Sequence, residues 1–72
     1  MIAPTYESGR YEFRVCHVGS TLIRKLDNRS VYFQPGDCDA AAREDVEHCF
    51  EHDEMTPGEN VRAFDRWAHE YF

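Results

Sequence analysis

The fold is decided by residues 29–50, which read RSVYFQPGDCDAAAREDVEHCF. The opening of this stretch is rich in β-branched and aromatic side chains, which is typical of a strand. Pro35 and Gly36 end that strand, because proline has no backbone N–H to give to a sheet and glycine suits a turn. Beyond them, apolar residues recur every three or four positions, as in a helix that buries one side. The stretch therefore predicts a strand that leads directly into an amphipathic helix.

Two more strands are predicted before this stretch. Residues 11–15 alternate apolar and polar side chains, the pattern of a half-buried strand, and residues 22–26 form another strand. Two-residue turns at positions 19–20 and 27–28 join the three strands into an antiparallel meander, because glycine, aspartate and asparagine tolerate turn backbones. Residues 1–9 lack this pattern, and we expect them to form an irregular lead-in.

These turns set a register that sorts the side chains by face. Phe13 then lies opposite Leu26, and Leu22 lies opposite Phe33. One face collects the apolar side chains Tyr11, Phe13, Val15, Leu22, Leu26, Val31 and Phe33. The other face collects Glu12, Arg14, Cys16, Thr21, Ile23, Lys25, Ser30 and Tyr32. Arg24 is the exception on the apolar face, where we expect it to reach the sheet edge or to pair with a carboxylate of the helix.

A second helix is predicted to start at residues 56–59. Thr56 and Glu59 have the spacing of a capping box, and Pro57 suits the first helical position. The same signal ends the first helix near Met55. Apolar residues at helical spacing follow, namely Val61, Phe64, Ala68 and Tyr71. The predicted fold is a single α+β domain of βββαα order, in which a three-stranded antiparallel meander (residues 10–34) is followed by two helices (residues 37–72) packed on one face.

The net charge of −6 is divided unevenly along the 72 residues. Residues 1–36 hold five bases and three acids, whereas residues 37–72 hold three bases and eleven acids. This asymmetry favours attraction to a basic partner and argues against direct binding of nucleic acid by the chain as a whole. The core of so small a domain is marginal, so a bound partner or a homodimer would add stability.

Most of the negative charge falls in residues 37–54, which contain eight acids and a single base, Arg43. Four glutamates at spacings of three, four and three lie on one line opposite the apolar stripe. They are Glu44, Glu47, Glu51 and Glu54. Like charges four residues apart, and acids near a helix C-terminus, are both unfavourable. Stability alone therefore does not explain the arrangement, and we predict that the line binds a partner.

The charge density of this segment approaches that of a nucleic acid strand. Residues 37–54 span about 27 Å as a helix, with about one net charge per 4 Å. One DNA strand carries a phosphate about every 3.4 Å, so a protein that binds phosphates could also bind this segment. Acidic solvated helix faces are common, however, and a purely solubilising role stays an alternative of equal weight.

Other residues border the line of glutamates. Asp45, His48 and His52 share one flank of the first helix, and Trp67 lies on a flank of the second. We place these four at the edge of the partner-binding surface, because tryptophan is a frequent interface anchor. Packing at the edge of the core is the alternative for Trp67. The histidines lack a third ligand at a recognised spacing, so no metal site is predicted, and surface histidines that titrate near neutral pH are the simpler interpretation.

Catalysis is not predicted. Cys16 and His17 are neighbours on a strand, so they point to opposite faces and cannot act as nucleophile and base. The sequence also lacks a glycine-rich phosphate loop and the order of a Ser-His-Asp triad. We expect neither an enzyme nor a bound cofactor.

The polar face of the sheet offers a second binding candidate. It carries the basic residues Arg14 and Lys25 together with Tyr32, and Arg10 is nearby. Basic side chains beside an aromatic ring can contact single-stranded nucleic acid. A small nucleic-acid-binding regulator that uses these four residues is therefore the alternative function.

The cysteines and the hydropathy indicate a cytoplasmic protein. The odd count of three cysteines (Cys16, Cys38 and Cys49) is a poor disulfide framework, so we expect reduced thiols. The sequence has neither a signal-peptide pattern nor an apolar run long enough to span a membrane, and we expect no membrane partner.

Residues 31–41, which read VYFQPGDCDAA, resemble a pattern in small, mostly uncharacterised proteins of phages and prophages. There, a hydrophobic strand runs into Gln-Pro-Gly-Asp-Asp-Ala and an acidic helix, followed by a second helix that bears tryptophan. The resemblance covers about residues 29–72, with Cys38 between the two aspartates. It implies a role in the cytoplasm of a bacterial host, in the class of host inhibitors that includes anti-CRISPR proteins and DNA mimics. No catalytic residue is implied.

The sequence thus predicts a non-enzymatic, acidic protein-binding module. The resemblance adds that it is a phage-encoded inhibitor of a host nucleic-acid-binding or defence complex, and that its partner is a host protein with a basic surface.

Overall fold

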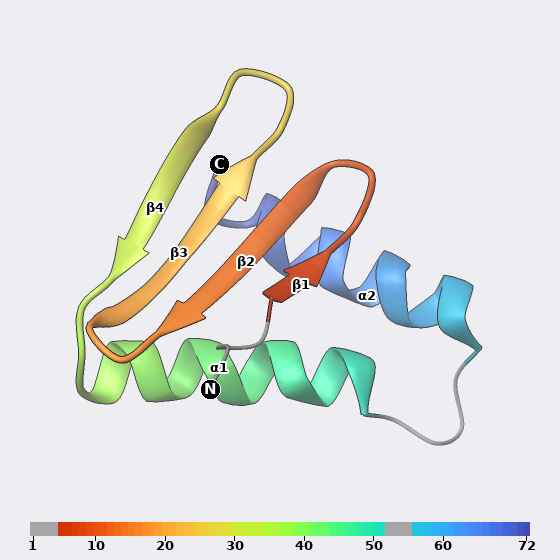
Figure 1. The fold of residues 1–72 in the computed structure, drawn as a ribbon. Helices are drawn as coiled ribbons and strands as arrows, with labels where there is room; N and C mark the ends of the chain where they lie inside the picture. Colours follow the sequence, from red (N-terminus) through yellow and green to blue (C-terminus); the bar gives the residue numbers. More distant parts are fainter. Residues whose placement is uncertain (1–4, 52–55) are drawn as a thin grey trace.

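The computed structural model describes residues 5–51 and 56–72. The elements follow in the order β1 (Thr5–Glu7), β2 (Tyr11–Cys16), β3 (Gly19–Arg24), β4 (Arg29–Phe33), α1 (Asp37–Phe50) and α2 (Pro57–His69). The strands form one antiparallel sheet in the order β1-β2-β3-β4, and both helices cover the same face of it (Figure 1). The predicted α+β class is confirmed, but the sheet has four strands instead of three.

Strand β1 lies in the segment that was predicted to be irregular, so that prediction was wrong for residues 5–7. A strand of three residues is too short for apolar alternation to be visible in the sequence. Tertiary contacts define it instead. Tyr6 lies opposite Phe13 of β2, and its ring stacks on Phe50 of α1 with 5.2 Å between centroids. Strand β1 thus connects the sheet to the end of α1.

The register of the sheet differs from the predicted one. Phe13 lies opposite Leu22 instead of Leu26, and Leu22 lies opposite Val31 instead of Phe33. Both shifts are by an even number of residues, and an even shift leaves each side chain on its own face of the sheet. The predicted apolar face therefore survives, except that Leu26 falls in the β3–β4 loop, where it is 89% exposed.

The first turn was also predicted at the wrong place, because Gly19 is needed inside β3. The turn residues are His17 and Val18, and Gly19 pairs with Cys16. Gly19 has a φ of 121°, which side-chain-bearing residues rarely adopt. A Cβ atom on it would lie only 2.6 Å from the carbonyl oxygen of Phe33. The glycine therefore allows β3 and β4 to approach closely.

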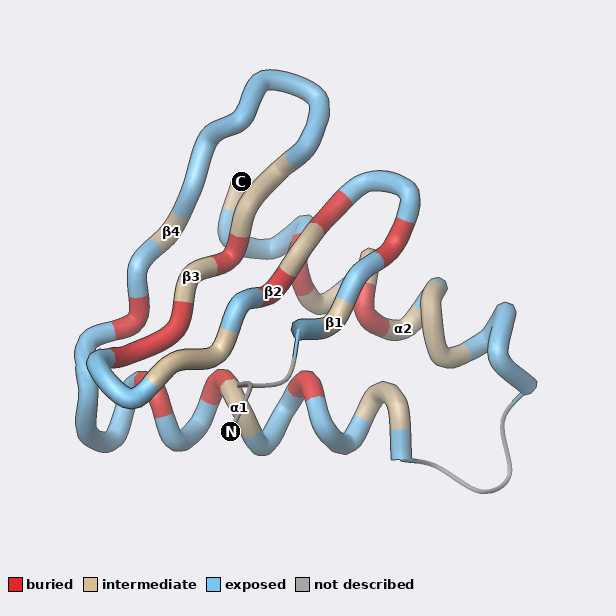
Figure 2. Tube along the Cα trace, in the orientation of Figure 1, coloured by how far each residue is buried: buried red, intermediate tan, exposed pale blue. Residues whose placement is uncertain are grey.

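The core lies between the inner face of the sheet and the helices. The sheet contributes Tyr11, Phe13, Leu22 and Phe33, and the helices contribute Ala42, Val46, Phe64 and Ala68. Buried segments recur along β2, β3, α1 and α2 in Figure 2. Arg24, the exception on the apolar face, pairs with Asp27 of the β3–β4 loop at 2.6 Å and not with a helix carboxylate. Its guanidinium lies 4.9 Å from the centroid of the Phe72 ring.

The two helices differ in how they begin. The capping box of α2 is confirmed, because the Thr56 hydroxyl accepts a hydrogen bond from the Glu59 N–H at 3.3 Å. Helix α1 has no side-chain cap, although Asp37 and Asp39 are of a residue type that often caps helices. Gly36 occupies the N-cap position with a φ of 124°. Helix α1 ends at Phe50, earlier than predicted.

Candidate functional site

The acids of α1 fall into two groups, and the first group is used inside the fold. Asp39 is buried and accepts a hydrogen bond from the hydroxyl of Ser20 in β3. It also pairs with Arg43, whose Nη2 atom lies 3.0 Å from Oδ2. The same Nη2 atom donates to the carbonyl oxygen of Cys16 at 2.5 Å. This network attaches the start of α1 to the β2–β3 hairpin, so Asp39 and Arg43 are not free to meet a partner.

Asp45 also has an internal role. The indole Nε1 of Trp67 donates a hydrogen bond to Asp45 Oδ2 at 3.2 Å, which links α1 to α2. The half-buried Trp67 ring lies at the edge of the core, 5.7 Å from the ring of Phe13 and 6.2 Å from that of Phe33. The structure thus brings two of the predicted site residues together, in a contact that belongs to the fold.

The second group of acids faces outward. Glu44 and Glu47 of α1 and its C-cap residue Glu51 are exposed and follow one another at spacings of three and four residues, so they lie along one side of the helix. This side lies away from the buried residues Ala42 and Val46. Within the residues that the structure describes, none of the three carboxylates forms an ion pair or a hydrogen bond. We call these three residues the acidic face.

The acidic face is not neutralised by the neighbouring helix. Arg62 and Arg66 are exposed on α2, but in the described parts of the chain neither forms an ion pair with an acid of α1. Arg43, the base of α1 itself, is engaged with Asp39. No arginine or lysine of the described residues therefore pairs with the three carboxylates.

One residue beside the acidic face was not predicted from the sequence. Tyr6 of β1 packs on Phe50, and its pKa is raised by burial and further by the carboxylates of Glu47 and Glu51. The tyrosine therefore borders the acidic face on the β1 side. Its segment lacked a strand pattern, so only the three-dimensional pairing of β1 with β2 reveals it.

The structure describes only some of the other residues that were predicted for this site. His48 is exposed on α1. His52 and Glu54 lie outside the described residues, so the predicted end of the glutamate line is not placed. Asp45 is exposed as well, but its carboxylate accepts the hydrogen bond from Trp67. The other exposed carboxylates of residues 37–51 are those of Asp37 and the acidic face, which amounts to about one charge per 6 Å of helix. This density is lower than predicted, because Asp39 and Asp45 are used inside the fold.

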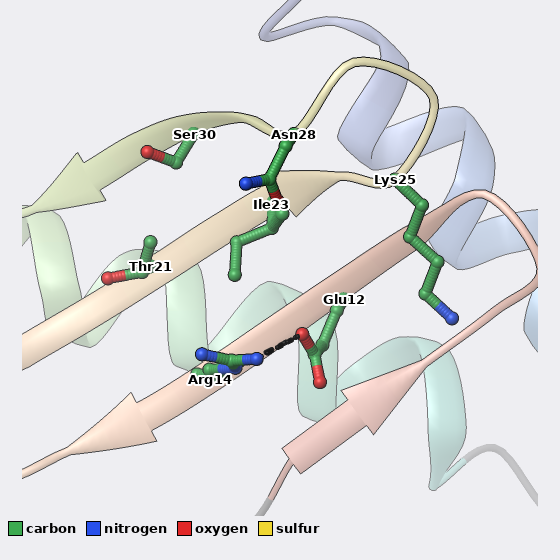
Figure 3. Close-up of a pocket in the computed structure, with 7 residues that line it drawn as sticks. All are labelled: Glu12, Arg14, Thr21, Ile23, Lys25, Asn28 and Ser30. Atoms are coloured by element: carbon green, nitrogen blue, oxygen red, sulfur yellow. Dashed lines mark hydrogen bonds and ion pairs between the residues drawn. The ribbon is translucent and has the colours of Figure 1, made fainter.

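The outer face of the sheet contains a shallow hollow of about 450 Å³ (Figure 3). Its lining comprises Glu12, Arg14, Thr21, Ile23, Lys25, Asn28 and Ser30. Arg14 pairs with Glu12 at 3.0 Å, and Lys25 pairs with Glu7 at 3.3 Å. Each cation of this face thus has a carboxylate beside it.

Two other residues of the alternative nucleic-acid site lie at the margins of this face. The hydroxyl of Tyr32 donates a hydrogen bond to the carbonyl oxygen of Val18, so the ring leans toward the β2–β3 turn. Arg10 lies in the β1–β2 turn and is not part of the hollow. The four residues therefore do not form one continuous basic surface.

Metal and thiol chemistry find little support among residues 5–51 and 56–72. No group of three or more His, Cys, Asp or Glu side chains in this part of the chain could hold a metal ion. Cys16, Cys38 and Cys49 are not joined in disulfides, and burial raises the pKa of Cys49. In the same residues, no helix has the length and apolar character needed to cross a bilayer.

Comparisons of the chain with family models, with curated proteins and with solved structures found no match. The candidate site therefore rests on the geometry described above.

Proposed function

We propose that the protein is a non-enzymatic binding module whose acidic face contacts a protein with a basic surface. The observation that supports this most is the division of the acids of α1. Asp39 and Asp45 have partners within the fold, whereas Glu44, Glu47 and Glu51 have none among the described residues. Carboxylates that make no contact within the described fold are available to attract a cationic partner.

The proposed partner is a host protein that normally holds nucleic acid, and the module would inhibit it by covering its phosphate-binding surface. The resemblance of residues 29–72 to small phage proteins motivates this choice. Because the charge spacing is wider than that of a DNA strand, imitation of individual phosphates is a weaker basis than simple charge complementarity. A stable interface covers about 800 Å² on each partner, so Tyr6 and His48 beside the acidic face would join the contact.

The test compares charge reversals at matched exposed positions. Glu44→Lys lies in the acidic face, and Glu70→Lys carries the same change at an exposed position after α2. Each immobilised protein is incubated with bacterial host lysate, and captured proteins are identified by mass spectrometry. We expect the unmodified protein and Glu70→Lys to retain a nucleic-acid-binding protein that added duplex DNA releases. Glu44→Lys, the matched single reversal, should retain less of it, and Glu44→Lys combined with Glu47→Lys should lose it.

Equal capture by the doubly reversed protein would refute the role of the acidic face. Capture only of proteins without a basic surface, or capture that duplex DNA leaves unchanged, would refute the proposed class of partner.

A further inference from the structure

The β1–β2 turn and the β3–β4 loop lie beside each other at one end of the sheet (Figure 1). The backbone N–H of Lys25 donates to the carbonyl oxygen of Arg10 at 2.9 Å, which joins the turn to the loop. Helix α1 crosses the other end of the sheet, where Ser20 and Asp39 meet. This end therefore lies away from the acidic face.

A hollow of about 390 Å³ opens at this end. Its lining comprises Gly9, Arg10, Tyr11, Arg24, Lys25 and Leu26. We call this the loop-end hollow. Leu26 is 89% exposed, more than any other large hydrophobic side chain of the described residues. A leucine this exposed adds nothing to the core, and its apolar area would leave water if a partner covered it.

The cations of the loop-end hollow differ in how they are held. Arg24 is fixed by its pair with Asp27 and by the ring of Phe72. The hydrogen bond from Arg24 lowers the pKa of Asp27 to about 2, so this pair remains charged at neutral pH. Lys25 donates to the carbonyl oxygen of Ser8 at 2.7 Å. Lys25 also pairs with Glu7 at 3.3 Å. Arg24 and Lys25 are therefore held in place, and each is balanced by a carboxylate.

Arg10 is different. It is exposed, and its guanidinium forms no ion pair or hydrogen bond within residues 5–51 and 56–72. A guanidinium presents a planar set of donors that matches a carboxylate in two parallel hydrogen bonds. The loop-end hollow thus combines an unused carboxylate-binding group with an exposed apolar side chain.

We propose that the loop-end hollow is a second binding site, for an acidic peptide segment that carries one large apolar side chain. A carboxylate of the segment pairs with Arg10, and its apolar side chain lies in the hollow against Leu26 and the wall formed by Tyr11. The charge of the hollow is complementary to an acidic segment and opposite to that of α1. The protein would therefore bind a basic partner at one end and an acidic partner at the other.

The geometry favours a peptide over a lipid surface. A single exposed leucine buries little apolar area, whereas stable attachment to a membrane needs a larger apolar insertion or several anchors. A concave site also suits an entering side chain better than it suits a flat array of headgroups.

The test uses an acetylated probe peptide of sequence Glu-Glu-Leu-Glu-Glu, titrated into ¹⁵N-labelled protein and followed by NMR. We expect amide shifts concentrated at Gly9, Arg10, Lys25 and Leu26. Arg10→Glu and Leu26→Ser should each weaken binding by about tenfold or more, as removal of a central contact does. Both residues are exposed, so the fold is retained. Arg62→Glu, the same reversal on the exposed side of α2, should leave the affinity unchanged.

Two further measurements separate this site from the acidic face. A peptide in which serine replaces the leucine should bind about tenfold more weakly, and the protein with Glu44→Lys and Glu47→Lys should bind the original peptide as before. The proposal would be overturned by shifts that map elsewhere or by equal affinity in Arg10→Glu. Binding of anionic phospholipid vesicles without binding of the peptide would also overturn it.

Discussion

Helices α1 and α2 cover the same sheet but are held to it by different interactions. Helix α2 is held to the sheet mainly by contacts between aromatic rings. Phe64 is fully buried. The ring of Trp67 is inclined by 26° to that of Phe33 and by 19° to that of Phe64, with 6.2 Å between centroids in both cases. Such contacts depend on shape and volume, so this side of the core tolerates little change.

Helix α1 buries only small apolar residues along most of its length, namely Ala42 and Val46, and relies on Asp39 and its partners at its start. A polar attachment needs fewer large apolar residues on the helix. The outer side of α1 can therefore carry residues that do not contribute to the fold, namely the glutamates of the acidic face. The exposed charge of α1 is thus related to the polar way in which this helix is attached to the sheet.

The most damaging change should be Phe64→Ala, which removes the ring at the centre of the α2 contact. We expect a loss of about 3–5 kcal/mol in the free energy of unfolding, because a cavity remains in the core. Urea denaturation followed by circular dichroism measures this loss. Arg62→Ala on the exposed side of the same helix should change stability by less than about 0.5 kcal/mol. A small effect of Phe64→Ala would contradict the dependence of α2 on rings.

Asp39→Ala tests the polar attachment of α1. It leaves Arg43 without its carboxylate and Ser20 without its acceptor, and we expect a loss of about 2–3 kcal/mol in the free energy of unfolding. Asp37→Ala is the matched control, because this aspartate lies in the same helical turn but is exposed. If both variants unfolded at the same urea concentration, the polar network would not hold α1.

Thr56→Ala tests the side-chain cap that α2 has and α1 lacks. It removes the hydroxyl that caps α2, and we expect a loss of about 1 kcal/mol in the free energy of unfolding. Thr56→Ser keeps an acceptor oxygen at this position and should be nearly neutral. Thermal unfolding of the three proteins in parallel measures the effect; a serine variant as unstable as the alanine variant would argue against the cap.

The smallest effect on stability is expected for Glu44→Lys combined with Glu47→Lys. These side chains have no partner among the described residues, so the free energy of unfolding should change by less than about 0.5 kcal/mol. The same denaturation assay applies. A loss above about 1.5 kcal/mol would mean that the acidic face supports the fold, and it would remove the basis for assigning it to a partner.

Features set by neighbouring residues were predictable from the sequence. The capping box at Thr56 and Glu59 was located correctly, and so was the strand that leads into a helix at Pro35 and Gly36. The outward position of Glu44 also follows from helical periodicity alone. These predictions need only local backbone geometry.

Features that depend on distant contacts were not predictable. The position of Gly19 is decided by its approach to Phe33 of another strand, so the register was missed. Asp39 is drawn inward by Ser20, nineteen residues away, although its residue type suggests an exposed cap. In the candidate site, the link from Asp45 to Trp67 spans two helices, and no pattern within either helix indicates it.

The close approach at Gly19 has a consequence for sequence tolerance. Any other residue there would need an unfavourable backbone angle, and its Cβ would collide with the Phe33 carbonyl and with the hydroxyl of Tyr32 at 2.7 Å. In saturation mutagenesis, position 19 should therefore accept glycine almost exclusively, although it is neither in a turn nor in the hydrophobic core. Because Gly19 has no side chain, the edge strand β4 can pack directly against its Cα, and any substitution would first displace that strand.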